Sequence, residues 1–171
     1  LTKEGVLRAA ENALRIAKSL PAGDVKLAEA PTVKDNVKTS VKVDPLDVDV
    51  ADKAKVCLEL DELIRGTSER IASATVTYMD ARGRKLFLNS DGSFVRVEFS
   101  RVFLGFLAVA RENGRVASYR GRVGRQGGLE GLAEEGEVRA REVALRAVEM
   151  LKASPCPKGK LTVIADPEHI G

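Results

Sequence analysis

The stretch that decides the fold reads SFVRVEFSRVFLGFLAVAR from Ser93 to Arg111, then Glu112-Asn113-Gly114, then RVASYRGRV from Arg115 to Val123. Two runs rich in β-branched and aromatic residues are separated by Asn-Gly, which is among the strongest short hairpin signals. The stretch therefore predicts two antiparallel strands. The first run is long for one strand, so Gly105 is a candidate bulge or bend within it.

Alternation within the first run predicts which side chains face the core. Apolar Val95, Val97 and Phe99 alternate with Phe94, Arg96, Glu98 and Ser100. Because successive side chains of a strand point to opposite faces, we expect Val97 and Phe99 to be buried and Arg96 to be exposed.

Further hairpin signals precede this stretch. A strand is predicted over Ile71–Met79, with a turn at Asp80-Ala81-Arg82-Gly83. A second strand is predicted over Lys85–Asn89, with a turn at Ser90-Asp91-Gly92. Consecutive hairpins form an antiparallel meander.

Three helices are predicted around the sheet. The first runs from about Thr2, its candidate N-cap, to Leu20, and the second from about Val50 to Arg65 after Asp47 or Asp49 as N-cap. The third runs from Leu132 or Glu137 to Ala153. We therefore expect an α+β fold, in which helices pack on one face of an antiparallel meander sheet.

Two segments suggest that the chain is part of something larger. The polar connection from Asp24 to Asp49 holds at most one edge strand, Val37–Val43, and connections this long usually have a function or pack on another part of a protein. The apolar run Leu161–Ala165 predicts a last strand over residues 160–166. We expect residues 1–171 to be a partial N-terminal domain whose last strand leads into an absent catalytic domain.

Composition limits the functional classes. The chain has 171 residues, 44% hydrophobic and 31% charged, with a net charge of +3. These values are typical of a globular domain and give no support for a nucleic-acid partner or a membrane span. Cys57 and Cys156 are far apart, which favours a reducing compartment over a metal site. A single glutamine (Gln126) among many Arg, Glu and Lys residues favours a thermophilic source.

Candidate chemistry is sparse. The only histidine, His169, lies beside Asp166 and Glu168. A catalytic zinc site needs about three protein ligands, so an ordinary loop is the favoured interpretation. Gly127-Gly128 with Arg125 could hold an anion through backbone N–H groups, although a flexible turn in a mobile loop over Gly124–Gly128 is favoured.

An arginine cluster could contact phosphates, but a solvated strand face is the favoured interpretation because few aromatic residues interleave it. Its members are Arg111, Arg115, Arg120, Arg122 and Arg125. We assign no catalytic, cofactor-binding or metal-binding residue in the chain.

Four short motifs in order resemble the TldD/PmbA (TldD/TldE) metallopeptidase family. Asp44-Pro45-Leu46-Asp47 before a helix resembles the family's DPLD segment, and Asn89-Ser90-Asp91-Gly92 resembles its NSxG hairpin. The stretch Gly124–Glu130 resembles its Gly-rich loop, with Gln126 as a departure. The tail, from Lys158 through Asp166-Pro167-Glu168 to Gly171, resembles the segment ahead of the catalytic helix in the TldD branch.

The resemblance implies a TldD-type zinc metallopeptidase as the parent, with its HExxxH motif beyond Gly171 and no zinc in these 171 residues. It implies cleavage of unfolded peptides in the cytoplasm and a PmbA/TldE-type partner subunit. The chain would supply the channel wall and partner contacts. Alternatives are a non-catalytic PmbA/TldE-type subunit or an unrelated α+β interaction module.

The sheet is also expected to present an unpaired edge. Another copy, the partner subunit or an extended peptide could fill it. In the alternative, Lys34–Val43 covers the edge and the chain is monomeric.

Overall fold

The computed structural model describes the chain except for residues 1, 22, 24–27, 156, 161 and 166–171. The chain divides into two units, residues 1–32 and 33–171. The first unit contains helix α1 (Lys3–Ser19), for which Thr2 is the N-cap, as predicted: its Oγ1 accepts from Gly5 N at 3.1 Å. The apolar side chains of α1 are exposed, and the helix has no buried residue.

The second unit is built on a four-stranded sheet with β3 (Phe94–Glu112) at its centre. One side of β3 pairs antiparallel with β2 (Ile71–Leu88) along almost its whole length. The other side pairs antiparallel with β4 (Arg115–Gln126) and, at residues 94–98, parallel with β1 (Lys34–Lys38). The predicted antiparallel meander is therefore confirmed as β2–β3–β4. The edge strand predicted over Val37–Val43 corresponds to β1, which spans Lys34–Lys38 and therefore begins three residues earlier. β1 pairs with β3 in parallel orientation.

Strand β2 is continuous, so the turn predicted at Asp80–Gly83 is wrong. Pairing with β3 runs through this segment without interruption, and Gly83 lies opposite Phe99. A side chain at Gly83 would come within 2.6 Å of the Phe99 ring, so glycine is needed here for packing and not for a turn. Asp80 forms an ion pair with Lys53 at 2.7 Å, which explains why a charged residue occurs at this position of the strand. Contacts with other elements therefore explain why Asp80 and Gly83, which are typical of turns, occur within a strand.

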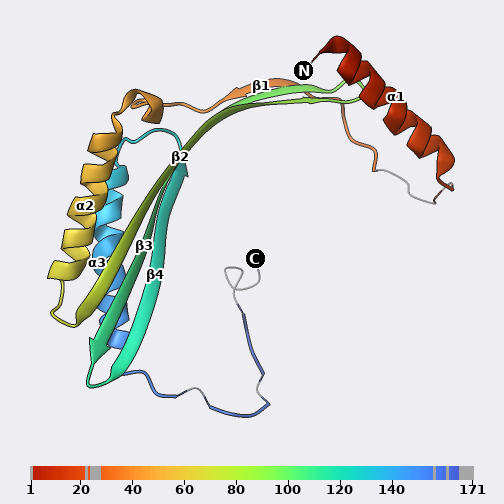
Figure 1. Cartoon of the computed structure of the whole chain (residues 1–171). Helices are drawn as coiled ribbons and strands as arrows, with labels where there is room; N and C mark the ends of the chain where they lie inside the picture. Colours follow the sequence, from red (N-terminus) through yellow and green to blue (C-terminus); the bar gives the residue numbers. More distant parts are fainter. Residues whose placement is uncertain (1, 22, 24–27, 156, 161, 166–171) are drawn as a thin grey trace. The chain divides into compact units, whose positions relative to one another are not determined.

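Helices α2 (Val50–Gly66) and α3 (Leu132–Met150) cover one face of the sheet (Figure 1). A short 3-10 helix, η1 (Pro45–Asp47), precedes α2. Asp49 is the N-cap of α2, accepting from Ala51 N at 2.7 Å, and is one of the two predicted candidates. The predicted α+β architecture, with helices on one face, is confirmed.

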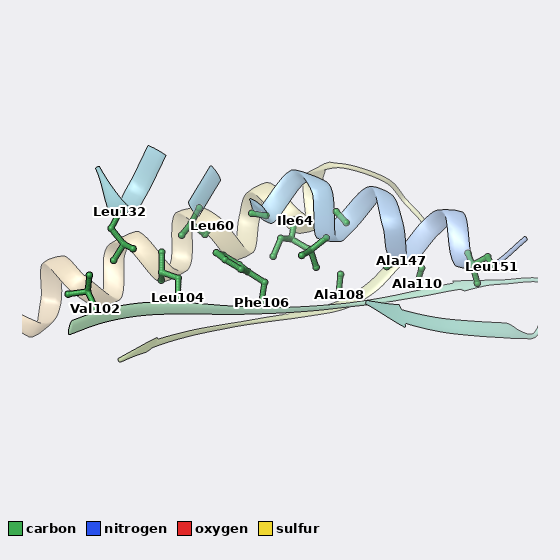
Figure 2. Close-up of a cluster of buried hydrophobic side chains, with 13 residues drawn as sticks. Leu60, Ile64, Val102, Leu104, Phe106, Ala108, Ala110, Leu132, Ala147 and Leu151 are labelled. Atoms are coloured by element: carbon green, nitrogen blue, oxygen red, sulfur yellow. The ribbon is translucent and has the colours of Figure 1, made fainter. Parts of the chain in front are cut away.

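The core lies between these helices and the even-numbered residues of β3 (Figure 2). Leu104 and Ala108 are fully buried there, against Leu60 and Ile64 of α2 and the small residues of α3. The expectation that Val97 and Phe99 point into the core is therefore wrong. They are half-buried on the opposite face, although Arg96 is exposed as predicted.

The error has a physical cause. Residues 102–110 are almost uniformly apolar and show no alternation, so the facing could be inferred only from residues 94–100. Gly105 also forms no bulge: it pairs regularly with Thr77 and Arg122.

The C-terminal segment does not form the predicted strand at the residues that can be checked. Residues 162–165 belong to no helix or strand, and Val163 and Ile164 are exposed. Residues 161 and 166 lie outside the described part. Within the described residues, none of the helices is long and apolar enough to cross a bilayer.

Candidate functional site

The Gly-rich segment at the end of β4, residues 124–128, is ordered by pairing and is not the mobile loop that we predicted. β4 continues to Gln126, and Arg125 and Gln126 lie opposite Val102 and Arg101 of β3. Gly127 N then donates to Ser100 O at 3.0 Å. The segment therefore extends the sheet before the chain enters α3.

A carboxylate of the chain itself occupies the backbone N–H groups of this segment. The Glu130 carboxylate accepts from Val43 N at 3.1 Å, Gly128 N at 3.3 Å and Lys42 N at 3.5 Å. Hydrogen bonds from its own backbone N–H and from these three groups lower the pKa of Glu130 to about 2. The proposed anion cradle at Gly127-Gly128 thus binds an anion, but an internal one.

Two further contacts fix the segment in place. Leu129 N donates to Val43 O at 3.0 Å, so residues 42–43 and 128–130 are bonded in both directions. A Cβ on Gly128 would lie 2.1 Å from Val43 O, so only glycine fits. We call Glu130, Gly128 and the Lys42–Val43 backbone the Glu130 clamp.

Arg125 supports the Glu130 clamp. One guanidinium nitrogen, Nη1, donates to Glu130 O at 2.7 Å, and the other, Nη2, lies 2.8 Å from Glu135 Oε1. Because these partners hold the guanidinium, Arg125 has a structural role and is not a free anion ligand.

Two of the three other quoted motifs also have structural roles; the end of the third, residues 166–171, lies outside the described residues. Asp44 Oδ1 accepts from Leu46 N at 3.1 Å and caps η1, while its other oxygen pairs with Arg82 of β2. Asn89 Oδ1 accepts from Ser93 N at 2.8 Å, which closes the β2–β3 hairpin at the predicted Ser90–Gly92 turn.

A cleft of about 570 Å³ lies beside the Glu130 clamp, bounded by residues 38–42, Asp44, Asp47, Arg82, Glu98 and Ser100. Its lining mixes cations with carboxylates, so it favours neither an anion nor a cation. The Ser100 hydroxyl has no hydrogen-bond partner among the described residues, but it is buried beneath the surface.

A half-buried polar cluster lies between α2 and β2. The Lys53–Asp80 ion pair lowers the pKa of Asp80. Burial is the main cause that raises the pKa values of Tyr78 and Cys57. A thiol with a raised pKa is poorly nucleophilic, so the cluster is not a candidate active site.

The predicted arginine cluster is dispersed. Arg115 donates to Ala153 O at 3.1 Å, and Arg125 belongs to the clamp. Arg111, Arg120 and Arg122 are exposed, as predicted, on the sheet face opposite α2 and α3.

We call this opposite side of β2, β3 and β4 the open face; among the described residues of the second unit, no helix covers it. It consists of the odd-numbered residues of β2 from Ser73 onward, the odd-numbered residues of β3 and the even-numbered residues of β4. Sequence reasoning missed Lys85 and Arg101 on this face, which flank the Phe99 ring with cation-to-centroid distances of 5.6 and 5.2 Å.

The open face also contains a hollow of about 730 Å³. Phe103 and Leu107 line it together with Arg120, Arg122, Thr75 and Thr77. The hollow also reaches Phe106, Tyr119, Gly121 and Arg139, which belong to the side that bears the helices. Gly105 contributes no side chain there, which leaves room in the hollow.

Side chains of the types that bind metals are scattered over the described residues. His169, Asp166 and Glu168 lie outside the described residues. Among those described, His, Cys, Asp and Glu side chains form no group of three or more that could hold a metal ion. The described part of the chain therefore does not fit a zinc site.

The sequence of the chain is similar to a known family of proteins. The family model described as the PmbA/TldA metallopeptidase central domain matches residues 43–154. A metalloprotease of Methanocaldococcus jannaschii is 33% identical over 168 residues, which is 98% of this chain and 37% of the relative. A metalloprotease of Methanothermobacter thermautotrophicus is 33% identical over 87% of this chain and 33% of its own length. The chain thus spans about a third of these relatives.

A solved structure shares the fold. A proposed modulator of a DNA gyrase from Thermotoga maritima MSB8 superimposes with a TM-score of 0.64 at 21% identity. The alignment covers 93% of this chain and 35% of that protein.

Proposed function

Because the chain belongs to the PmbA/TldD family of metallopeptidases, we propose that it is a non-catalytic part of a TldD-type zinc metallopeptidase that cleaves unfolded peptides in the cytoplasm. The observation that carries this proposal is the match over residues 43–154, which include β2, β3, β4, α2 and α3. Two relatives that are 33% identical to the chain over the aligned residues are named metalloproteases, which supports a peptidase parent.

Within such an enzyme, the chain would form part of the channel wall and contact a PmbA/TldE-type subunit. Among the described residues, no strand pairs with the outer edge of β2 or of β4. Along β2, part of this edge is covered, since Arg65 of α2 donates to Ala74 O at 3.3 Å. The uncovered edge could hold an extended peptide through backbone hydrogen bonds, which give affinity with little regard for side chains.

The metal would be held by other residues of the parent. In an HExxxH peptidase two histidines bind zinc, and a glutamate assists water in attacking the peptide carbonyl. We expect that motif beyond Gly171, with residues 1–171 as the domain ahead of it. The family model is described as a central domain, so the position of the chain within the parent stays a prediction.

The test is an assay of the longer natural protein with an unstructured peptide. Hydrolysis is expected, with loss of activity on chelation and on replacement of the motif's glutamate by glutamine. If the sequence after Gly171 lacks HExxxH and the longer protein cleaves nothing, the alternative of a non-catalytic PmbA/TldE-type subunit is correct.

A further inference from the structure

The open face has an unusual charge composition. Its cations are Lys85, Arg101, Arg111, Arg120 and Arg122, and β2, β3 and β4 place no Asp or Glu on it. All five side chains belong to exposed residues, and none forms an ion pair with a carboxylate among the described residues. By contrast, Arg82 and Arg125 on the helix-bearing face have acidic partners, Asp44 and Glu135. Five cations without carboxylates produce a field that attracts acidic groups.

The cations also follow the length of the sheet. Through the pairing register they lie level with β3 positions 97, 101, 105, 107 and 111. At about 3.3 Å per residue, this line is roughly 46 Å long. Half-buried Phe99, Phe103 and Leu107 lie between the cations and offer apolar contact.

The hollow marks the best-defined point on this line. Arg120 and Arg122 line it and are two residues apart on one strand, a spacing of roughly 6.7 Å. An extended peptide repeats its side-chain direction at the same spacing, so carboxylates at alternate positions could meet both arginines while the residues between them point away. Thr75 and Thr77 supply hydroxyl groups for the peptide backbone on the other side of the hollow.

We propose that the open face binds extended, acidic segments of unfolded polypeptide, with Arg120 and Arg122 as the principal contacts. This inference rests on the proposed function, because it names the class of peptide that the parent would hold. Backbone hydrogen bonds at the sheet edge would hold a peptide with little regard for its sequence, whereas the cations of the open face would favour peptides with acidic side chains.

Other occupants fit the face less well. Two copies of this chain cannot pair through the face symmetrically, since five cations would meet five cations. A single-stranded nucleic acid would find cations, but stacking along the line needs exposed aromatic rings between them. Phe99 and Phe103 are half-buried, and the exposed Phe87 lies beyond Lys85, at the end of the line.

The test measures binding by the 171-residue chain, so it does not depend on peptidase activity. The probe is an unstructured, fluorescently labelled peptide of about 14 residues with Glu at alternate positions, which matches the length of the cation line. A peptide with Lys at the same positions and a deoxythymidine oligonucleotide are the comparison probes. Fluorescence anisotropy is read at low and at physiological ionic strength.

We expect binding of the Glu peptide, little binding of the Lys peptide, and a lower affinity at higher salt. The Arg120→Gln/Arg122→Gln double variant should weaken binding about fivefold or more, since two exposed ion pairs are lost. The control variant Arg96→Gln/Arg141→Gln removes the same charge from exposed residues outside the open face and should change the affinity less than about twofold. Circular dichroism confirms that each variant is folded.

Three results would overturn the inference: equal binding of the Glu and Lys peptides, an unchanged affinity in the Arg120/Arg122 variant, or tighter binding of the oligonucleotide. None of them bears on whether the longer protein hydrolyses peptides. Conversely, an inactive longer protein would refute the proposed function and leave this binding result in place.

Discussion

Truncation of two leucines on β3 tests the assignment of the core face. Leu104 is fully buried against α2 and α3, whereas Leu107 lies three positions along the strand on the open face and is half-buried. Leu104→Ala removes about three buried carbon groups, each contributing roughly 0.8 kcal/mol, and leaves a cavity that adds to the loss. We therefore expect a cost of about 3–4 kcal/mol for Leu104→Ala and about 1–2 kcal/mol for Leu107→Ala.

Urea unfolding, followed by circular dichroism, measures both changes. The two variants remove the same atoms from the same strand, so their difference reports burial alone. Equal costs would show that the open face is as well packed as the core face, and a larger cost for Leu107→Ala would invert the assignment of faces. Either result would refute the layered arrangement from which the candidate surface was derived.

Three further predictions concern the Glu130 clamp and the polar cluster. Gly128→Ala should destabilise the chain and increase proteolysis near Val43, because a Cβ would lie 2.1 Å from Val43 O; equal resistance to protease would contradict this. The folded-state pKa of Glu130 is lowered from 4.5 to about 2, so its stabilising effect should be present above pH 4.5 and lost as the pH falls towards 2. In acid titrations the Glu130→Gln variant should lack this loss, and parallel curves for both proteins would refute the clamp. Because burial raises the pKa of Cys57, its alkylation at pH 8 should be slower in the folded chain than in urea, and equal rates would count against the packing of α2 on β2.

Local signals predicted the parts of the fold that depend on local chemistry. The turn Asn113-Gly114 has positive φ values of 49° and 78°, the conformation for which Asn-Gly is selected. Thr2 and Asp49 cap helices because a short side-chain oxygen can reach the first free N–H groups. These devices act within four residues, so a single sequence displays them.

Long-range contacts account for the errors. Asp80–Gly83 has the composition of a turn, but two of its residues are explained by contacts with other elements. Asp80 forms an ion pair with Lys53 on α2, and Gly83 leaves space for the Phe99 ring on β3. The facing of β3 was extrapolated from residues 94–100, but the helices cover residues 102–110. Only the three-dimensional arrangement reveals which half of a long strand is covered.

The candidate site was predicted in part. Gly127-Gly128 suggested backbone N–H groups that bind an anion, and the structure contains such groups. Their anion, Glu130, is close in sequence, but the other donors come from Lys42 and Val43, almost 90 positions away. The open face was missed because its cations come from three strands and share a side only through the pairing register.

The most direct test of the central claim is the zinc content of two purified proteins, the 171-residue chain and the longer natural protein, after dialysis against metal-free buffer. We expect roughly one zinc ion per chain in the longer protein, since an HExxxH helix with a further ligand completes a site of about three protein ligands. We expect no stoichiometric zinc in the 171-residue chain. One tightly held zinc ion in the 171-residue chain, or none in an active longer protein, would refute the assignment of the metal site to residues beyond Gly171.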